Sequence, residues 1–212
     1  KNWQLLSGNY ILALVVGEIL SNAGNPKNKI VVANDATSNL VRDIVQKYGA
    51  KLKDVQAGET NVVEEMQKSK AIIGGEGSSS GVILPPSKCR DGILTLLMIL
   101  AIVAKKEKKL HDIIDEFPKY FTLRKKIEFK IKKHDNIKKY LKNYYSKKGF
   151  EIRETGGIKG SLKVVTGKNS FVWFRASKTE SNVFRIISDS DKKEEAEKLI
   201  EEAVGVFRKG NE

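Results

Sequence analysis

The sequence has little of the chemistry that disulfides and metal sites need. It runs to 212 residues with one cysteine, Cys89, and two histidines, His111 and His134. A single cysteine cannot close an intrachain disulfide, which excludes a disulfide-stapled scaffold and makes a reducing, cytoplasmic setting the expectation. Cys89 and the two histidines have no recognisable zinc-ligand spacing, so no metal site is predicted.

The sequence also lacks an apolar run long enough to cross a membrane. Its longest run, ILTLLMILAIVA at 93–104, is shorter than the roughly 20 residues that a bilayer requires, so it predicts a buried helix and no membrane partner. The opening stretch has no cationic region followed by a small-residue cleavage site, as a secretory signal would have. Because the sequence begins with Lys1, we expect either a removed start or a piece of a longer chain.

Acidic residues are in deficit, with 26 Asp and Glu against 39 Lys and Arg, which gives a formal net charge of +13. Such an excess attracts anions, including nucleic acid, acidic lipid and phosphorylated small molecules. The lysines concentrate at 123–148, where we favour a solvated surface over a nucleic-acid patch because a charge run alone is weak evidence. Tyr140, Tyr144 and Tyr145 interleave with these lysines, but they fall on the apolar stripe of a predicted helix, which favours packing over base stacking.

Helices and strands alternate through residues 1–118, which predicts a three-layer α/β sandwich. Asn61, with Glu64 three residues later, predicts the start of a helix, and Asp91 predicts the start of the helix at 93–104. The other predicted elements are a helix at 11–20, a strand at 29–34, a helix from Asp35 or Thr37 to Gly49, and strands at 51–55, 70–75 and 81–86.

The pattern changes near Pro118, where we predict a boundary between domains at 1–118 and 119–212. Runs of strands flanked by helices predict a small α+β second domain. Its predicted elements are strands at 121–131, 149–154, 160–167, 170–176 and 183–188, a helix at 136–148, and a C-terminal helix with Ala196, Leu199, Ile200, Ala203, Val204 and Phe207 on one face.

One loop, FRASKTESNVFRI at 174–186, places arginines and hydroxyls between two predicted strands. Arg175 and Arg185 come from different strands, so they can converge on one anion, and Glu180 could orient one of them. A guanidinium fork matches two phosphate oxygens, and hydroxyls can donate to the others. On composition alone a phosphate cradle and a polar hairpin with incidental arginines are about equally supported.

A second loop, IIGGEGSSSGVILPP, puts Glu76 at its tip. A carboxylate there can accept hydrogen bonds from adjacent hydroxyls of a sugar. The loop is neither a Walker A loop nor a dinucleotide fingerprint, because it lacks the following lysine and the three-glycine spacing. By itself it is more typical of a flexible Gly/Ser connector.

Together the two loops resemble those of the α-D-phosphohexomutases, which include phosphomannomutases, phosphoglucomutases and phosphoglucosamine mutases. The stretch GGEGSSSGVILPPSKCRDGILTLLMIL resembles the sugar-binding loop and following helix of their third domain, with the Arg-Asp-Gly of archaeal-type members. The stretch RASKTESNVFRI resembles the phosphate loop of their fourth domain, and AGETNVVEEM looks like their Val-Gly-x-x-x-Val segment. The resemblance covers almost the whole chain.

This resemblance implies a fold and a binding site. The third domain would occupy 1–118, and the fourth would occupy 119–212 with a TBP-like sheet and helices on one face. Glu76 and Ser78 would bind the hydroxyls of a hexose phosphate, and Arg90 would contact the phosphosugar. The residues that the resemblance assigns to its phosphate are Arg175, Ser177, Lys178, Thr179 and Arg185.

The sequence departs from the family pattern in several places. Ala176, Lys178 and Ser181 stand where Pro, Gly and Pro are usual, and Arg185 lies one position later than the family's arginine. Ser79 and Ser80 replace Gly and His. The family's phosphoserine loop and its Asp-Gly-Asp-x-Asp-Arg metal loop are not in this sequence. It therefore resembles the C-terminal half of a phosphohexomutase, and no catalytic residue is assigned.

In the family, a phosphoserine exchanges phosphate with the sugar through a bisphosphorylated intermediate, assisted by Mg²⁺. The resemblance therefore implies Mg²⁺ for the complete enzyme, not bound by this chain, and an N-terminal half on the same parent chain or on a separate polypeptide. Three hypotheses remain: part of a mutase that transfers phosphate within a hexose phosphate, a non-catalytic phosphosugar-binding module, and, least favoured, a basic nucleic-acid binder.

Overall fold

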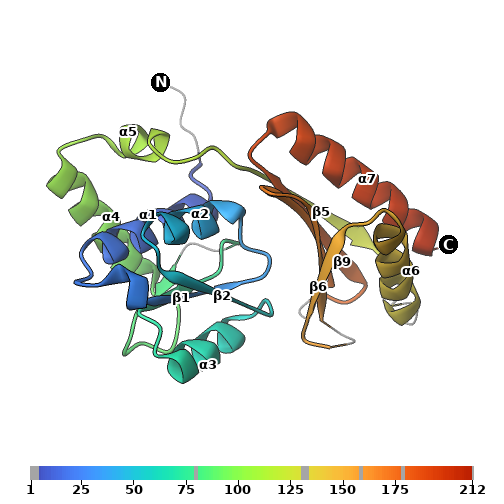
Figure 1. Cartoon of the computed structure of the whole chain (residues 1–212), viewed down its shortest axis with the longest axis horizontal. Helices are drawn as coiled ribbons and strands as arrows, with labels where there is room; N and C mark the ends of the chain where they lie inside the picture. The colour runs from blue at the N-terminus through green and yellow to red at the C-terminus, as the bar shows by residue number, and fades with distance from the viewer. Residues whose placement is uncertain (1–4, 79–80, 130–133, 158–159, 178–179, 212) are drawn as a thin grey trace. The chain divides into compact units, whose positions relative to one another are not determined.

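The computed structural model of the chain describes residues 5–78, 81–129, 134–157, 160–177 and 180–211. The chain forms two compact units, Lys1–Lys119 and Tyr120–Glu212. Each unit consists of a sheet with helices packed against it (Figure 1). This architecture confirms the predicted fold class, an α/β unit followed by a second unit with its own sheet.

In the first unit a four-stranded sheet lies between two layers of helices (Figure 1). The strand order is β2-β1-β3-β4; the first three strands are parallel, and β4 runs antiparallel to β3. Helices α1 and α2 cover one face and α3 covers the other. The elements are α1 (Gly8–Ser21), a 3₁₀ turn (Pro26–Asn28), β1 (Ile30–Asn34), α2 (Asn39–Lys47), β2 (Lys51–Val55), α3 (Glu59–Ser69), β3 (Ile73–Gly75), β4 (Val82–Ile83), α4 (Gly92–Lys106) and α5 (Leu110–Asp115).

Side-chain caps explain where two of these helices begin. The Ser38 hydroxyl accepts a hydrogen bond from the Leu40 backbone N–H at 3.2 Å, so α2 begins later than predicted. Asp91 caps α4 as predicted, because its Oδ1 accepts from the Leu94 N–H at 2.8 Å.

The predicted cap at Asn61 is wrong. Helix α3 begins two residues earlier, at Glu59, after Gly58 has turned the chain with a φ of 134°. The Asn61 amide instead donates to the carbonyls of Gln56 and Ala57, at 3.1 and 3.3 Å. Asn61 therefore stabilises the loop before the helix, because its short polar side chain can bond to nearby backbone on either side.

Helix α4, which is predicted to be buried, is buried on one side only. Ile102 is 2% exposed and packs with Leu14 of α1 and Ile113 of α5. On the opposite side are Ile93, Leu96, Leu97 and Leu100, with exposed fractions of 77%, 56%, 57% and 55%. The prediction of a buried helix is therefore wrong for this chain, and the physical reason is that the run is apolar around the whole helix while this unit packs against only one side of it.

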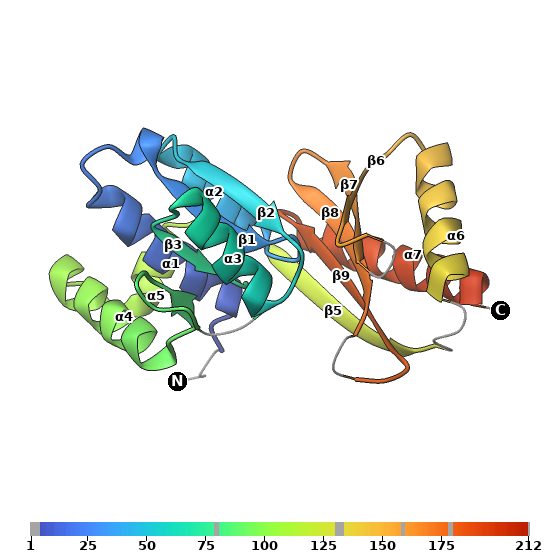
Figure 2. The same cartoon turned by 90° about the horizontal axis from the view of Figure 1, so that it is seen from below.

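The second unit contains a five-stranded antiparallel sheet in the order β5-β9-β8-β7-β6. Helices α6 and α7 lie on the same face of this sheet (Figure 2). The elements are β5 (Phe121–Glu128), α6 (His134–Lys147), β6 (Glu151–Thr155), β7 (Ser161–Gly167), β8 (Ser170–Ala176), β9 (Val183–Ser190) and α7 (Lys193–Asn211). The end of the strand predicted at 121–131 lies outside the described residues.

Strand alternation builds the core of the second unit. Every second side chain of a strand points to the same face, and Leu162, Val164, Val172 and Phe174 are buried toward the helices. Cross-strand pairing places Leu162 opposite Phe174 and Val164 opposite Val172. The alternate residues, which include Lys163, Trp173 and Arg175, therefore lie on the other face of the sheet.

No helix within the described ranges is both long enough and apolar enough to cross a membrane.

Candidate functional site

Three loops of the first unit meet at the carboxyl edge of its parallel strands. Asn34 ends β1, Gly58 comes shortly after β2, and Glu76 directly follows β3. Parallel strands present their carboxyl ends at one edge, which is where open α/β sheets bind ligands. We call the set Asn34, Thr37, Gly58, Glu76 and Gly77 the strand-end loops.

A buried carboxylate is at the centre of the strand-end loops. Glu76 is 9% exposed, and its Oε1 accepts hydrogen bonds from the Asn34 side-chain amide at 2.6 Å and from the Gly58 N–H at 2.8 Å. Each donor comes from a different loop, so one carboxylate oxygen joins the ends of β1, β2 and β3. Burial of a carboxylate is tolerated when it is hydrogen-bonded in this way.

Thr37 and Asn9 complete this network. The Thr37 hydroxyl donates to Asn34 Oδ1 at 2.8 Å and accepts from the Gly77 N–H at 3.1 Å. Asn9 of α1 accepts from the Ser38 N–H at 3.1 Å, and a Cβ added at Gly77 would lie 1.7 Å from Asn9 Oδ1. Gly77 is therefore required here because the backbone approaches the Asn9 side chain too closely for any other residue.

The predicted residue Arg90 lies at the same edge. Its backbone N–H and its guanidinium Nε donate to the two oxygens of Glu59, at 3.0 and 2.5 Å. Burial raises the pKa of Glu59, but the hydrogen bonds from Arg90 outweigh this effect, so the net shift of its pKa is downward. Since Gly58 binds Glu76 and the next residue binds Arg90, the structure brings Glu76 and Arg90 into one group of loops.

Ser78, also predicted, is exposed in the turn after Gly77. Two residues separate it from β3, and Ser78 is open to solvent there. Ser79 and Ser80 lie outside the described residues.

In the second unit the two predicted arginines face each other across neighbouring strands. Arg175 of β8 pairs in register with Arg185 of β9, which in turn pairs with Lys126 of β5. Directly opposite residues in an antiparallel pair have Cβ atoms about 4.5–5.5 Å apart. We call Arg175, Arg185 and Lys126 the cation row.

One carboxylate bridges two members of the cation row. Glu180 accepts from Arg185 at 2.6 Å and from Lys126 at 2.7 Å. The hydrogen bonds from Lys126 and then from Arg185 lower the pKa of Glu180, so it stays ionised below its ordinary range. Glu180 thus bonds two of the three cations of the row, one on β9 and one on β5.

The hairpin that follows Arg175 is stabilised by two hydrogen bonds of Ser177, one made by its side chain and one by its backbone. Ser177 Oγ accepts from the Glu180 N–H at 3.1 Å, and the Ser177 N–H donates to the Val183 carbonyl at 2.7 Å. This places Ser177 and Glu180 at the end of the cation row. Lys178 and Thr179, both predicted site residues, lie outside the described residues.

The sequence interpretation missed two contributors. Lys126 was not predicted as a site residue, because only the strand register shows that it lies opposite Arg185. Asn34 and its neighbours gave a usable signal, since NDATSN directly follows a β-branched strand and these side chains are buried despite being polar.

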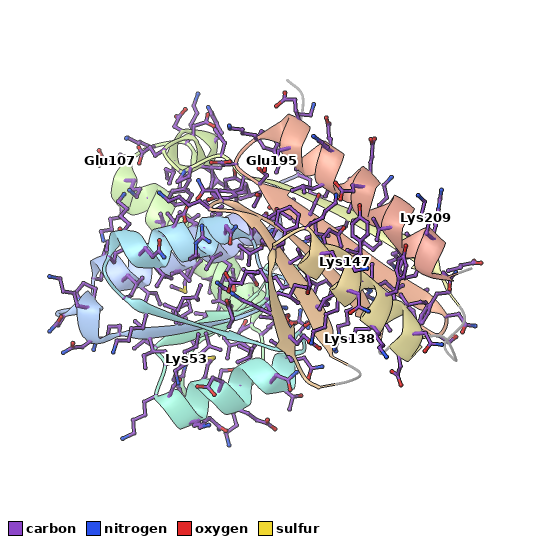
Figure 3. All side chains as sticks on the ribbon, turned by 45° about the vertical axis from the view of Figure 1, so that its right-hand side comes forward. Lys53, Glu107, Lys138, Lys147, Glu195 and Lys209 are labelled. Atoms are coloured by element: carbon purple, nitrogen blue, oxygen red, sulfur yellow. The ribbon has the colours of Figure 1, made fainter. Side chains whose placement is uncertain are left out.

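The lysine-rich stretch is only partly a solvated surface. Lys138 and Lys147 both lie on α6 (Figure 3), but Lys138 is 8% exposed and its Nζ donates to the Gly157 carbonyl at 2.7 Å. Of the three tyrosines predicted to pack, Tyr145 is buried and Tyr144 is half-buried, while Tyr140 is 38% exposed. The prediction that Tyr140 packs in the core is therefore wrong; its ring lies beside Gly210 at the end of α7 and stays partly open to solvent.

Two further features do not coincide with the predicted site. A groove of about 520 Å³ is lined by Met66, Ile72, Pro85 and neighbours, and none of the predicted residues lines it. In the described ranges, no three His, Cys, Asp or Glu side chains are gathered in a way that could hold a metal ion.

Comparison with known families decides the relationship. Residues 7–121 match the family model of phosphoglucomutase/phosphomannomutase, alpha/beta/alpha domain III, which is more than half of the 212 residues. The chain belongs to the phosphoglucomutase/phosphomannomutase family. A phosphoglucosamine mutase of Methanococcus maripaludis is 34% identical over 188 residues, which are 86% of this chain and 40% of that protein.

Another relative, a phosphoglucomutase/phosphomannomutase of Thermococcus kodakarensis, is 33% identical over 207 residues, covering 95% of this chain and 42% of its own length. This family member thus spans about two fifths of the curated relatives that it matches.

Solved structures share the fold at lower identity. A phosphoglucomutase/phosphomannomutase family protein of Burkholderia thailandensis has a TM-score of 0.73 at 17% identity, covering 98% of this chain and 42% of that one. The N-acetylphosphoglucosamine mutase of Aspergillus fumigatus, solved with GlcNAc-6P and magnesium, has a TM-score of 0.71 at 14% identity, covering 99% and 45%. These likenesses extend over both units of the family member.

Proposed function

We propose that this chain is the sugar- and phosphate-binding part of a phosphohexomutase. The observation that carries the proposal is the cation row, in which Arg175 and Arg185 are directly opposite and Lys126 follows in register. Like charges directly opposite each other destabilise a sheet, so a row of this kind favours an anionic ligand. Guanidinium forks match pairs of phosphate oxygens, which makes phosphate the preferred anion.

The strand-end loops supply a different chemistry, which suits the hydroxyls of a sugar. Glu76 is already fixed by Asn34 and Gly58, so it can accept from sugar hydroxyls without reorganising. We assign a further hydroxyl contact to Ser78 and a contact with the phosphosugar to Arg90. We assign phosphate contacts to Arg175, Ser177, Lys178, Thr179 and Arg185, with Lys126 added from the strand register.

The groups that transfer phosphate are proposed to come from an N-terminal half, on the same parent chain or on a separate polypeptide. The described carboxylates of the site are already engaged, Glu59 with Arg90 and Glu180 with Arg185, and they do not form a magnesium ligand set. Mg²⁺, held by that other half, would neutralise charge on the transferring phosphoryl group. We expect the reaction in the cytoplasm, because the single cysteine suits a reducing setting.

The identities of the relatives support a hexose phosphate as the substrate class. Two of them are a phosphoglucosamine mutase and a phosphoglucomutase/phosphomannomutase, and the Aspergillus mutase was solved with GlcNAc-6P. The alternative, a phosphosugar-binding module without catalysis, uses the same residues. It differs in predicting no turnover when the N-terminal half is supplied.

Replacement of Arg175 tests the proposal. In calorimetric titration with glucose 6-phosphate, Arg175→Ala should bind about 10- to 100-fold more weakly, since a charge-assisted hydrogen bond contributes roughly 1.5–3 kcal/mol. Arg175→Lys should lose less affinity, because lysine keeps the positive charge but lacks the guanidinium fork.

Arg153→Ala is the matched control, because Arg153 lies on β6 of the same sheet and pairs with Glu151 instead of the row. Its affinity should be unchanged. Equal affinity of Arg175→Ala and the unmodified chain would refute the phosphate role of the cation row.

A further inference from the structure

The side of α4 that faces away from its own unit carries an unbroken apolar surface. Its large residues follow the spacing i, i+3, i+4, i+7, and each is more than half exposed. Ala101 and Ala104 continue the surface toward the C-terminal end of the helix, and both are exposed. We call Ile93, Leu96, Leu97 and Leu100 the outer face of α4.

Helix α4 is firmly attached to its unit, so the exposure is not that of a detached helix. Ile102 packs with Leu14 and Ile113 on the inner side. Lys105 donates to Glu18 of α1 at 2.7 Å and to Asn22 at 3.1 Å. A helix that is apolar on all sides is typical of a protein interior, so the outer face requires a covering surface.

The outer face begins beside the candidate site. Glu76 directly follows Gly75, which pairs with Val82 of β4, and Val82 in turn bridges to Asp91, the cap of α4. The Val82 N–H also donates to Thr95 of α4 at 3.0 Å. A surface docked on the outer face would therefore lie next to the loop that carries Glu76.

We infer that the outer face of α4 is the docking surface for the N-terminal half of the mutase. This inference rests on the proposed function, which requires groups that this chain does not supply. The relatives are more than twice as long as the match, and the matched family model is that of a domain III, so domains precede it in the family. An aliphatic face without aromatic or charged residues is typical of a permanent interface within one protein.

The other occupants fit the surface less well. A helix that lies on a membrane has a charged polar face and carries Trp or Phe with Lys or Arg along its length. The inner side of α4 instead packs against protein, and its lysines are confined to the C-terminal end. A second copy of the chain would cover the face without bringing any missing group to Glu76.

A labelling experiment tests the inference. The portion of the Thermococcus kodakarensis relative that precedes its match is fused in front of this chain, in which Cys89→Ser removes the only thiol and Leu97→Cys adds one to the outer face. Thiol modification at this position should be about tenfold or more slower in the fusion than in the chain alone, because buried thiols react poorly. The matched control is Gln67→Cys, an exposed position on α3, which should react equally fast in both.

Each other outcome overturns the inference. An unchanged rate at position 97 in the fusion shows that the N-terminal half docks elsewhere. If labelling of the chain alone slows as its concentration is raised, a second copy is the occupant. If labelling slows only when phosphatidylserine vesicles are added, the occupant is a membrane. Turnover of glucose 6-phosphate separates the two claims: protection without turnover refutes the proposed function, whereas turnover without protection refutes only the docking surface.

Discussion

The strand-end loops and the cation row carry charge of opposite sign in opposite surroundings. In the first, a single negative charge on Glu76 is buried among neutral donors from Asn34 and Gly58. In the second, three cations line up across strands, and Glu180 bridges two of them, Lys126 and Arg185. Under the proposed function, the first arrangement would accept hydrogen bonds from neutral hydroxyls, whereas the second would bind a dianion.

The two carboxylates should therefore respond differently to change. Glu76 belongs to a buried network, where loss of a hydrogen-bond partner affects the folded state. Glu180 is half-buried near the surface, where a pair of this kind contributes little to stability but strongly shapes the local field. The predictions below set one region against the other.

The largest effect is expected from Asn34→Asp. This isosteric change replaces the donor at 2.6 Å from Glu76 by a second carboxylate, and it should lower the free energy of unfolding by about 2–3 kcal/mol at pH 7. The loss should shrink as the pH falls toward about 4, because two adjacent carboxylates can then share a proton. Urea unfolding followed by circular dichroism at both pH values measures it.

Asn143→Asp is the control, since Asn143 is exposed on α6 and the same change should stay within about 0.5 kcal/mol there. An Asn34→Asp chain as stable as the unmodified one at pH 7 would show that the network around Glu76 does not hold the strand-end loops together.

A smaller effect of the other kind is expected from Glu180→Gln. Removing the carboxylate that bridges Lys126 and Arg185 should strengthen binding of glucose 6-phosphate by roughly two- to fivefold at low salt, with unfolding changed by less than about 0.5 kcal/mol. Because the pKa of Glu180 is lowered, its charge persists on acidification and is lost only below that lowered value. The difference between variant and unmodified chain should therefore persist below the ordinary range of a glutamate and vanish at still lower pH.

Glu151→Gln serves as the comparison, because Glu151 pairs with Arg153 away from the cation row. Weaker binding by Glu180→Gln would mean that the carboxylate orients the arginine for the ligand instead of competing with it.

The smallest effect is expected from changing exposed lysines of α6. Lys139→Gln with Lys147→Gln should alter glucose 6-phosphate affinity by less than about twofold at physiological salt, where screening acts over about 8 Å. The nucleic-acid hypothesis instead expects the double change to reduce binding of a DNA duplex and to flatten a steep salt dependence. Titrating glucose 6-phosphate and the duplex against the double variant distinguishes the two hypotheses. Loss of sugar-phosphate binding would indicate that the anion binds at α6 and not at the cation row.

Sequence periodicity and caps were sufficient to predict much of this fold. Alternation in 160–176 predicted two strands of the second sheet, and Asp91 predicted the start of α4, because both signals are local. Asn61 failed because its amide can bond to backbone before or after it with similar energy. Local sequence does not decide between such alternatives.

The candidate site was predictable to the extent that its residues share a loop. Arg175 and Arg185 flank one hairpin, so their convergence follows from the turn, whereas Lys126 joins them only through pairing of β5 with β9. The exposure of the outer face of α4 could not be predicted for a different reason. Its apolar sequence is typical of a buried helix, but the residues that the structure describes leave this side exposed.

The strand-end loops also bear on the entropy of ligand binding. Asn9 of α1 accepts from the neighbour of Thr37, and the hydrogen bonds continue through Asn34, Glu76 and Gly58, so they join a helix to the loops after β1, β2 and β3. The conformational freedom of these loops is lost when the unit folds, long before a sugar arrives. Association therefore need not order them again, and a larger share of the contact energy remains available as affinity.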